Sequence, residues 1–342
     1  MLEAYPLASD EFDIIQRYFN SKALAFPVPE LALGIGDDCA LLELAPHSRL
    51  AMSMDLLQEG VHFLTDSDPY LLGKRTLLVN LSDLAAMGAR PVCFTLGLSL
   101  PTCDEQWLQA FSQGLAEVAQ ANGCALVGGD LTSSGMAIKT ICVQVHGVLP
   151  KNEAMLRSGA KVGDNIYVTG TLGDAAAGLA VLQGSVKASL SAKDKAALID
   201  AFYVPESRVT AGQLLRPLAS SCIDLSDGLA SDLQHILKAS AVGAQIELTA
   251  LPVSSAFKEA TPEGQWFDLA LGGGDDYELC FTLAPELKDS MEAVFSQHGI
   301  AVQCIGSIRQ GSGIDWLREG QITTLSVRGY NHFAQPHTHG VV

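Results

Sequence analysis

Short β-prone runs alternate with helical runs along most of this chain, and this alternation restricts the fold more than any other feature of the sequence. In the first half, β-prone runs at 50–54, 92–98 and 138–148 are separated by helical runs at 71–87 and 105–121. The second half continues the pattern, with expected strands and helices at 165–169, 175–182, 207–218, 222–225, 229–239 and 245–248. Such alternation is typical of a sheet covered by helices. We therefore predict an α/β fold.

Two signals predict a domain boundary near residue 150. Pro150 and the polar stretch after it interrupt the alternation. A chain of 342 residues also commonly folds as two domains. We therefore expect domains at 1–150 and 151–342. The first should open with an amphipathic helix at 10–19, because Ser9 is a suitable N-cap and apolar residues follow it at helical spacing.

The charge, the cysteines and the apolar runs restrict the partners and the compartment. The 38 acidic residues outnumber the 21 Lys and Arg, and the net charge of -17 repels nucleic acid. The eight cysteines form no C-x-x-C pair, which favours reduced thiols over a disulfide framework or a zinc site. The first twenty residues do not resemble a secretory signal, and no apolar run approaches the ~20 residues that span a bilayer. We expect a cytoplasmic protein without a membrane partner.

Aspartates gather beside glycines in six short segments. These are GIGDDCA (34–40), SMDLLQEGVHF (53–63), NLSDLAAMGA (80–89), VGGDLTSS (127–134), DLSDGLASD (224–232) and GGGDDYELCF (272–281). Apolar residues bound the segments, so we interpret them as turn-like junctions at strand ends, where side chains face a crevice. We expect their carboxylates to converge.

Carboxylates that converge in a crevice repel one another unless a cation neutralises them. Aspartate, serine and backbone oxygens suit a hard ion, and Mg²⁺ is the usual ion where phosphates share the coordination. For any single segment, an Asx turn or a helix cap explains the aspartate equally well. Six segments together favour a metal site. Calcium stays open as an alternative, although the chain has no D-x-D-x-D-G loop.

The glycines of the same segments indicate a phosphate site. Gly34 and Gly36, Gly128 and Gly129, and the run 272–274 allow main-chain N–H groups to approach a phosphate closely. The chain has no G-x-x-x-x-G-K-[ST] motif, no complete dinucleotide fingerprint, and neither H-R-D nor D-F-G. A phosphate site made of glycine loops, magnesium and aspartates remains.

Two further residues have more than one interpretation. Arg157 is a candidate phosphate clamp, because its guanidinium matches phosphate oxygens, and it is equally well explained as a surface residue. His62 could contact a ligand or belong to the core.

The ordered motifs identify a resemblance. GIGDDCA, D-x-x-x-E-G-V-H-F, N-x-S-D-x-x-A-M-G-A, VGGD, R-x-G-A-x-x-G-D, VTGTLGD, D-x-S-D-G-L-x-x-D and GG-x-DYEL-x-F run from residue 34 to 281, and GYNHF follows at 329–333. Together they resemble the thiamine-monophosphate kinases, which belong to the aminoimidazole ribonucleotide synthetase (PurM-like) superfamily. The combination of EGVHF with DYEL is specific to the kinases.

The resemblance implies an activity and an architecture. The activity is ATP-dependent phosphorylation of thiamine monophosphate to thiamine diphosphate, the last step of thiamine diphosphate biosynthesis, by direct in-line transfer with several Mg²⁺ ions and no general base. The architecture is a homodimer of two-domain chains. An N-terminal ATP- and Mg²⁺-binding domain forms a dimeric β-barrel, a C-terminal α/β domain follows, and the active site lies between them.

The resemblance also implies a role for individual residues. The implied magnesium ligands are Asp38, Ser53, Asp55, Asp83, Asp130, Asp224 and Asp227. The implied ATP contacts are Gly129, Asp130, Arg157 and Ser226, and the implied substrate contacts are His62, Asp275 and Tyr330.

Three residues depart from the family pattern. Met54 replaces a hydroxyl residue, Asp275 replaces Glu, and Tyr330 replaces Trp. The adenine contact that some members place near Phe111 and Ser112 has no clear equivalent here. Two other functions stay open: another ATP-dependent synthetase of the superfamily, and a non-catalytic protein that binds nucleotide and Mg²⁺.

Overall fold

The computed structural model describes residues 11–186, 190–325 and 327, and the chain divides into two compact units. The first unit comprises residues 1–80 and 91–148, and the second comprises 81–90 and 149–342. Helix α2 (Pro69–Ala86) therefore contributes residues to both units.

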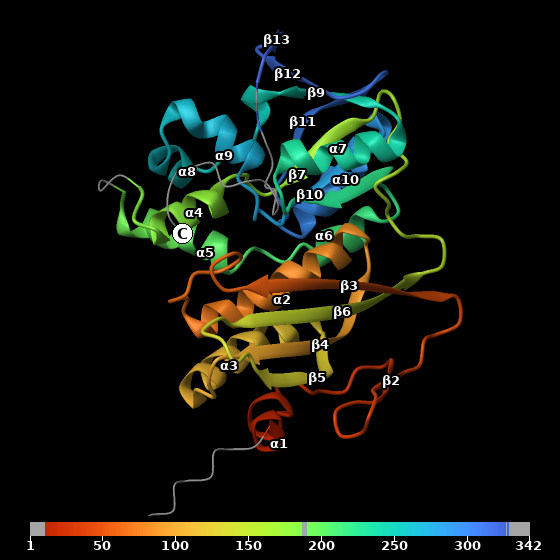
Figure 1. The fold of residues 1–342 in the computed structure, drawn as a ribbon. Coiled ribbons are helices and arrows are strands. Elements are labelled where there is room, and N and C mark those ends of the chain that lie inside the picture. The colour runs from red at the N-terminus through yellow and green to blue at the C-terminus, as the bar shows by residue number, and fades with distance from the viewer. Residues whose placement is uncertain (1–10, 187–189, 326, 328–342) are drawn as a thin grey trace, which may run out of the picture. The chain divides into compact units, whose positions relative to one another are not determined.

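The described part of the first unit is built on a four-stranded sheet of order β3-β6-β4-β5 (Figure 1). Its strands are β3 (Ser48–Gln58), β4 (Arg90–Leu100), β5 (Ala125–Ser133) and β6 (Thr140–Pro150), and the short pair β1 (Leu31–Leu33) and β2 (Leu41–Leu42) lies outside it. Its helices are α1 (Glu11–Ile14), the π-helical η1 (Ile15–Phe19), α2 and α3 (Glu105–Asn122). Strands β4 and β5 are parallel and are joined by α3, as a β-α-β connection requires.

Local signals explain the bounds of α3. The Asp104 carboxylate accepts from the Gln106 and Trp107 amides at 2.9 and 3.1 Å, which caps the first turn. Gly123 ends the helix with φ of 60°. Glu117 of α3 accepts from the Tyr70 hydroxyl of α2 at 2.7 Å and pairs with an ammonium of the same helix. The predicted helices at 71–87 and 105–121 are confirmed.

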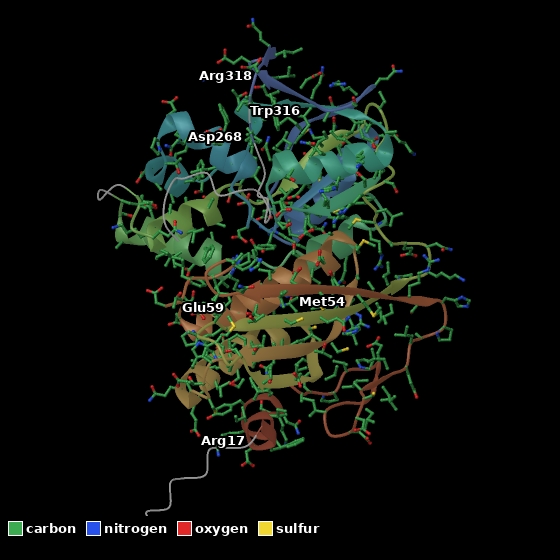
Figure 2. The ribbon with its side chains drawn as sticks, in the orientation of Figure 1. Arg17, Met54, Glu59, Asp268, Trp316 and Arg318 are labelled. Carbon is green, nitrogen blue, oxygen red and sulfur yellow. The ribbon has the colours of Figure 1, made fainter. Side chains whose placement is uncertain are left out.

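Strand β3 exposes a row of apolar side chains. Leu50, Met52, Met54 and Leu56 are between 37% and 61% exposed, while the residues between them are half-buried. Successive side chains of a strand point to opposite faces, so the four share one face of the edge strand. Met54 is labelled in Figure 2.

The described part of the second unit contains a seven-stranded sheet of order β13-β12-β9-β11-β7-β10-β8. Its strands are β7 (Asn165–Thr169), β8 (Ser221–Asp224), β9 (Gly243–Glu247), β10 (Leu279–Leu283), β11 (Val302–Arg309), β12 (Ile314–Arg318) and β13 (Gln321–Thr323). Its helices are α4 (Asp174–Leu182), α5 (Ala192–Tyr203), α6 (Val209–Leu215), α7 (Leu229–Ser240), α8 (Ser255–Ala260), α9 (Trp266–Gly272) and α10 (Lys288–Gln297), with single 3₁₀ turns η2 (Leu248–Ala250), η3 (Glu263–Gln265) and η4 (Pro285–Leu287). Strand β12 pairs parallel to β9, and the other pairings that include β7, β10 and β11 are antiparallel.

Helices cover both faces of this sheet. Ile166 and Val168 of β7 join a core cluster with residues of α4, α5, α7, α8 and α9. Tyr167 points to the opposite face and stacks on Phe281 of β10, which meets Phe295 of α10 edge to face. This alternation follows from the two-residue period of a strand and confirms the predicted α/β layering.

The interpretation of all six acidic segments as turn-like junctions was wrong for three of them. Asp55 lies within β3, Asp83 within α2 and Asp130 within β5. In β5, Phe94 pairs with Leu126 and Thr95 with Gly128, so one residue of β5 is left over as a bulge. The Gly-Gly pair therefore marks an irregular strand, because glycine inside a strand accompanies bulges as well as turns.

Two expectations about the whole chain can be compared with the described residues. All eight cysteines are free thiols. Among the described helices, none has the length and apolar character that crossing a membrane requires.

Candidate functional site

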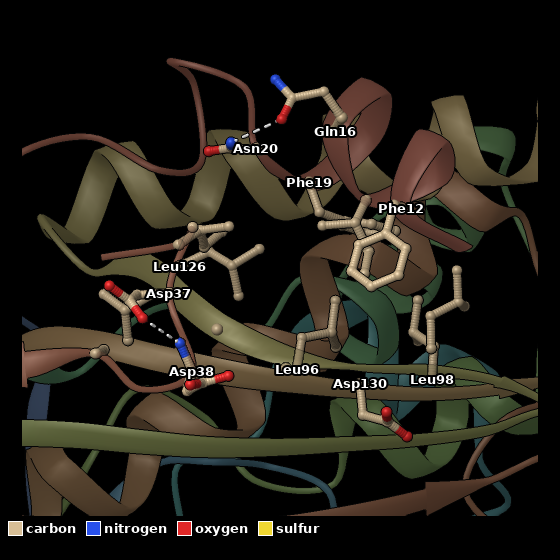
Figure 3. Close-up of a pocket in the computed structure, with 18 of the residues that line it drawn as sticks. Phe12, Gln16, Phe19, Asn20, Asp37, Asp38, Leu96, Leu98, Leu126 and Asp130 are labelled. Carbon is tan, nitrogen blue, oxygen red and sulfur yellow. Dashed lines mark hydrogen bonds between the residues drawn. The ribbon is translucent and has the colours of Figure 1, made fainter. Parts of the chain in front are cut away.

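A cavity of about 760 Å³ in the first unit brings two of the predicted segments together (Figure 3). One wall is the loop 35–40, and the second is the stretch 126–131 of β5. Leu96 and Leu98 of β4 lie between these walls and the helical residues of α1 and η1. The glycine-aspartate loops that we predicted to form a phosphate site therefore line a single cavity.

The polar side of this cavity carries Asp37, Asp38 and Asp130. The Asp38 amide donates to the Asp37 carboxylate at 2.9 Å, which fixes the loop in an Asx-type turn. Asp38 and Asp130 are exposed. A Cβ atom added at Gly129 would lie 1.9 Å from the Leu96 carbonyl oxygen, so the close contact of β5 with β4 requires glycine here.

Strand β3 positions Ser53 and Asp55, which do not line this cavity. The Asp55 amide donates to the Asn80 side-chain carbonyl at 3.1 Å, and the Asn80 amide group donates to the Thr76 carbonyl at 2.8 Å. Asn80 is fully buried in α2 and was missed as a positioning residue. A buried amide in an apolar helix needs a polar partner, and that was the available signal.

His62 follows β3 and has a defined tautomer. Its Nδ1 accepts from the Gln58 amide at 3.0 Å, so the neutral ring carries its proton on Nε2. The ring is half-buried. Beside it, the buried Glu59 pairs with Lys139 at 3.0 Å, which fixes the end of β3.

In the second unit, Asp224 ends β8 and is buried. The Ser82 hydroxyl donates to its Oδ2 at 2.8 Å. Ser82 belongs to the part of α2 that is assigned to this unit, and the next residue is the predicted ligand Asp83, which is half-buried. The hydroxyl was missed because the sequence separation is 142 residues.

The structure brings together the segments 224–228 and 272–278. The Asp275 amide donates to the Ser226 carbonyl and the Tyr277 amide to the Leu225 carbonyl, both at 2.8 Å. Gly274 has φ of 69°, and a Cβ atom there would lie 2.6 Å from the Ser226 oxygen. Asp275 and Tyr277 also have positive φ, at 62° and 49°, a strained backbone of the kind that is concentrated at functional sites.

Asp232 fixes the loop between β8 and α7. Its Oδ2 accepts from the Asp227 amide at 3.0 Å, and the side chain is buried. Burial raises the pKa of Asp232 to about 7, and the carboxylates of Asp227 and Asp224 act in the same direction. Sequence reasoning recorded the spacing D-G-L-x-x-D without assigning Asp232 a role.

A second acidic network lies behind the DYEL segment. Arg208 donates to both carboxylate oxygens of Glu278, at 2.5 and 2.6 Å, and also pairs with Glu206 at 3.0 Å. Asp276 accepts from the Gly173 amide at 2.8 Å through Oδ1, whereas its buried Oδ2 has no hydrogen-bond partner among the described residues. These residues line a cavity of about 300 Å³.

The remaining predicted residues occupy varied environments. Ser226 and Arg157 are exposed, and the Arg157 carbonyl accepts from Ser240 at 3.3 Å. Tyr330 lies outside the described residues. Within 11–186, 190–325 and 327, no three His, Cys, Asp or Glu side chains are grouped closely enough to hold a metal ion.

Comparisons with known proteins agree with the motifs. The family model of the AIR synthase related protein N-terminal domain matches residues 36–149, and that of the C-terminal domain matches 161–316. The thiamine-monophosphate kinase of Escherichia coli (strain K12) is 46% identical over 335 residues, which cover 96% of this chain and 100% of that protein.

Two solved structures have the same fold. The thiamine-monophosphate kinase of Stenotrophomonas maltophilia K279a matches with a TM-score of 0.79 and 40% identity, over 86% of this chain and 93% of that one. The structure described as AaThiL complexed with AMPPCP and TMP matches with a TM-score of 0.73 and 29% identity, over 94% and 96%. With both of its parts matched to the AIR synthase related domains and nearly its whole length aligned to such an enzyme, the chain belongs to the thiamine-monophosphate kinase family.

Proposed function

We propose that this chain transfers the γ-phosphate of ATP to thiamine monophosphate and so forms thiamine diphosphate. The observation that carries the proposal is the cavity of the first unit, where a loop with two aspartates faces a Gly-Gly-Asp segment. Such a surface suits a polyphosphate that is accompanied by cations. The full-length similarity to thiamine-monophosphate kinases supports the choice of acceptor.

The chemistry matches the available side chains. The acceptor is a phosphate monoester that is already ionised at neutral pH, so its oxygen can attack without a strong base. The main obstacle is the repulsion between two anions, which must be neutralised while they are aligned. The chain therefore needs cation ligands and positioning groups, and we assign no catalytic base.

The donor set fits Mg²⁺. We propose Asp38, Ser53, Asp55, Asp83, Asp130, Asp224 and Asp227 as ligands for several ions. Mg²⁺ prefers oxygen donors, keeps several waters and is commonly held by only one or two carboxylates together with substrate phosphates. Exposed Asp38 and Asp130 on one cavity supply such a pair, so the lack of a group of three carboxylates in the described residues agrees with this mode. Bound Mg²⁺ would neutralise phosphate charge and orient the two reactants.

We assign the other contacts from the family motifs. Gly129, Asp130, Arg157 and Ser226 would contact ATP, and His62, Asp275 and Tyr330 would contact thiamine monophosphate. The exposed guanidinium of Arg157 can reach a phosphate, and Nε2–H of His62 can donate to one. Asp275 is shorter than the usual Glu, so we expect a water molecule to bridge it to the substrate.

We further propose a homodimer in which the sheet of residues 1–150 completes a barrel with its copy. The exposed apolar row of β3 supports this, because an edge strand with large apolar side chains is an association surface. Sedimentation at micromolar concentration should give twice the chain mass of 36.1 kDa, and a monomer would contradict the proposal. The free thiols agree with a reducing compartment, and we propose the cytoplasm.

One assay tests the activity. The purified chain is incubated with thiamine monophosphate, ATP and Mg²⁺, and thiamine diphosphate, ADP and orthophosphate are quantified by chromatography. We expect thiamine diphosphate and ADP in equal amounts, and no turnover after chelation of the metal. Release of orthophosphate without thiamine diphosphate would instead indicate a synthetase of the superfamily, and ATP binding without turnover would indicate a non-catalytic protein.

A further inference from the structure

The cavity of the first unit has two chemically different sides. Glycines and carboxylates form one side, as described above. The other side is apolar and consists of Phe12, Ile15, Phe19, Leu96, Leu98 and Leu126. A phosphate or a metal ion needs only the first side, whereas a nucleotide has both a charged chain and a flat apolar ring. The volume of about 760 Å³ is in the range that accommodates a ligand of that size.

The helical segment 11–19 presents an uncovered aromatic ring to this cavity. Phe12 is 77% exposed, although Ile14 and Phe19 of the same segment are buried. The segment is thus held by other residues, and Arg17 pairs with Glu105 of α3 at 3.2 Å. Figure 3 shows the Phe12 ring extending from the helix toward the strands that carry Leu96 and Leu98. Protein packing does not explain this ring, and a planar ligand would cover it.

Two amide side chains stand at the rim beside the ring. The Asn20 Nδ2 donates to the Gln16 Oε1 at 3.0 Å, and both residues line the cavity. With this bond made, the outer groups of the pair are the NH₂ of Gln16 and the carbonyl of Asn20, one donor beside one acceptor. Adenine presents an amino donor next to a ring-nitrogen acceptor, which is the complementary pattern.

We propose that the segment 11–20 is the base-recognition element of this enzyme, with Phe12 stacked on adenine and the Gln16–Asn20 pair bonded to its edge. The inference rests on the proposed function, and it supplies the adenine contact that has no equivalent near Phe111 and Ser112. The phosphates then extend toward Gly129 and Asp130, because both sides belong to one cavity. Selectivity for the base and handling of the phosphates are thus assigned to separate parts of the first unit.

Binding to a base-free analogue separates these two parts. Isothermal titration of the full-length chain with Mg²⁺ uses AMPPCP, GMPPCP and inorganic tripolyphosphate as probes. We expect Phe12→Ala to weaken AMPPCP binding about tenfold and to leave tripolyphosphate binding unchanged, since only the nucleotide has a ring to stack. Phe12→Tyr keeps the ring and should restore the affinity. Gln16→Leu combined with Asn20→Leu should reduce the preference for AMPPCP over GMPPCP about tenfold.

Arg17→Gln is the matched control, because Arg17 lies on the same segment and does not line the cavity. It should leave the affinities for all three probes unchanged. An unchanged AMPPCP affinity in Phe12→Ala, or an equal loss for AMPPCP and tripolyphosphate, would overturn the inference. So would a change confined to sedimentation, which would make Phe12 a contact with a second copy of the chain. If the variants behave as expected but thiamine diphosphate never forms, the base-recognition element stands and the proposed acceptor fails.

Discussion

The two units use the same sequence pattern, aspartate beside glycine, in opposite physical settings. In the first unit, Asp38 and Asp130 are exposed on an open cavity. In the second unit, Asp224, Asp232 and Asp276 are buried and accept from a hydroxyl or from backbone amides. The comparison teaches that an acidic motif identifies a ligand site only where its carboxylates stay accessible. Where they are buried, they hold their own loops, and substitutions there should change stability as well as activity.

The largest effect should come from breaking the buried ion pair of the second unit. Arg208→Met leaves the buried Glu278 without its bidentate partner, and such a loss costs about 3–5 kcal/mol. Urea unfolding followed by the fluorescence of Trp266 and Trp316 in the second unit measures it. Adding Glu278→Leu should recover most of the loss, because two apolar side chains replace the pair.

The control for this experiment is Lys288→Met, which removes a half-exposed pair with Glu292 at 3.7 Å in the same unit. Its cost should stay below about 1 kcal/mol. Equal losses in Arg208→Met and Lys288→Met would mean that burial does not distinguish the acids of the second unit.

The open cavity should show the reverse behaviour. Asp130→Asn removes a proposed Mg²⁺ ligand, and we expect kcat/KM to fall at least about 100-fold, which is equivalent to roughly 2.7 kcal/mol. The unfolding free energy should change by less than about 0.5 kcal/mol, because the side chain is exposed. Asp66→Asn, an exposed residue outside the acidic segments, should alter neither quantity. Full activity of Asp130→Asn would remove Asp130 from the proposed site.

Ser82→Ala tests whether Asp224 belongs to the buried class. The variant removes a hydroxyl that donates to a buried carboxylate, and hydrogen bonds to charged groups contribute about 2 kcal/mol. The comparison is Ser112→Ala, where a buried hydroxyl donates to the uncharged carbonyl of Gln109 and about 1 kcal/mol is expected. Urea unfolding of both variants measures the difference. A smaller loss for Ser82→Ala than for Ser112→Ala would show that Asp224 does not depend on this donor.

The local elements were readable from the sequence where their end signals are local. Asp104 and Gly123 bound α3 at the places where a cap and a left-handed residue are expected. Strand β5 was not predicted, because its Gly-Gly pair has the composition of a turn and only its pairing with β4 makes it a strand. Local propensity describes a segment by itself, whereas strand formation depends on the neighbour.

The candidate site was predictable in its chemistry and only partly in its geometry. The pairing of the loop 35–40 with the segment 128–130 in one cavity was expected from their shared glycine-aspartate character. The bond from Ser82 to Asp224 and the bond from Asp55 to Asn80 were not, because they join residues distant in the sequence that have no common pattern. Such partners are set by tertiary packing, which one sequence does not display.

Asp276 provides the smallest and most specific test, through pH. Burial raises its pKa well above the ordinary value of 3.8; the Gly173 amide opposes this, and the carboxylates of Glu278, Asp174 and Asp275 add to it. A carboxyl group with a raised pKa in the folded chain stabilises that chain most below pH 3.8, where it is protonated in both states. As the pH rises toward the folded value, the unfolded chain releases this proton first, so stability falls.

The loss that Asp276 contributes should reach about 1.4 kcal/mol per pH unit within this window. Asp276→Asn keeps the size of the side chain and cannot ionise, so its unfolding free energy should fall less steeply between pH 4 and pH 7. Asp232 and Glu278, whose pKa values are also raised, contribute equally to both chains, and the difference between the two slopes therefore isolates Asp276. Parallel slopes would show that Asp276 is ionised in the folded chain, which would require a cation beside its buried Oδ2 and would place it with the ligand-binding acids of the first unit.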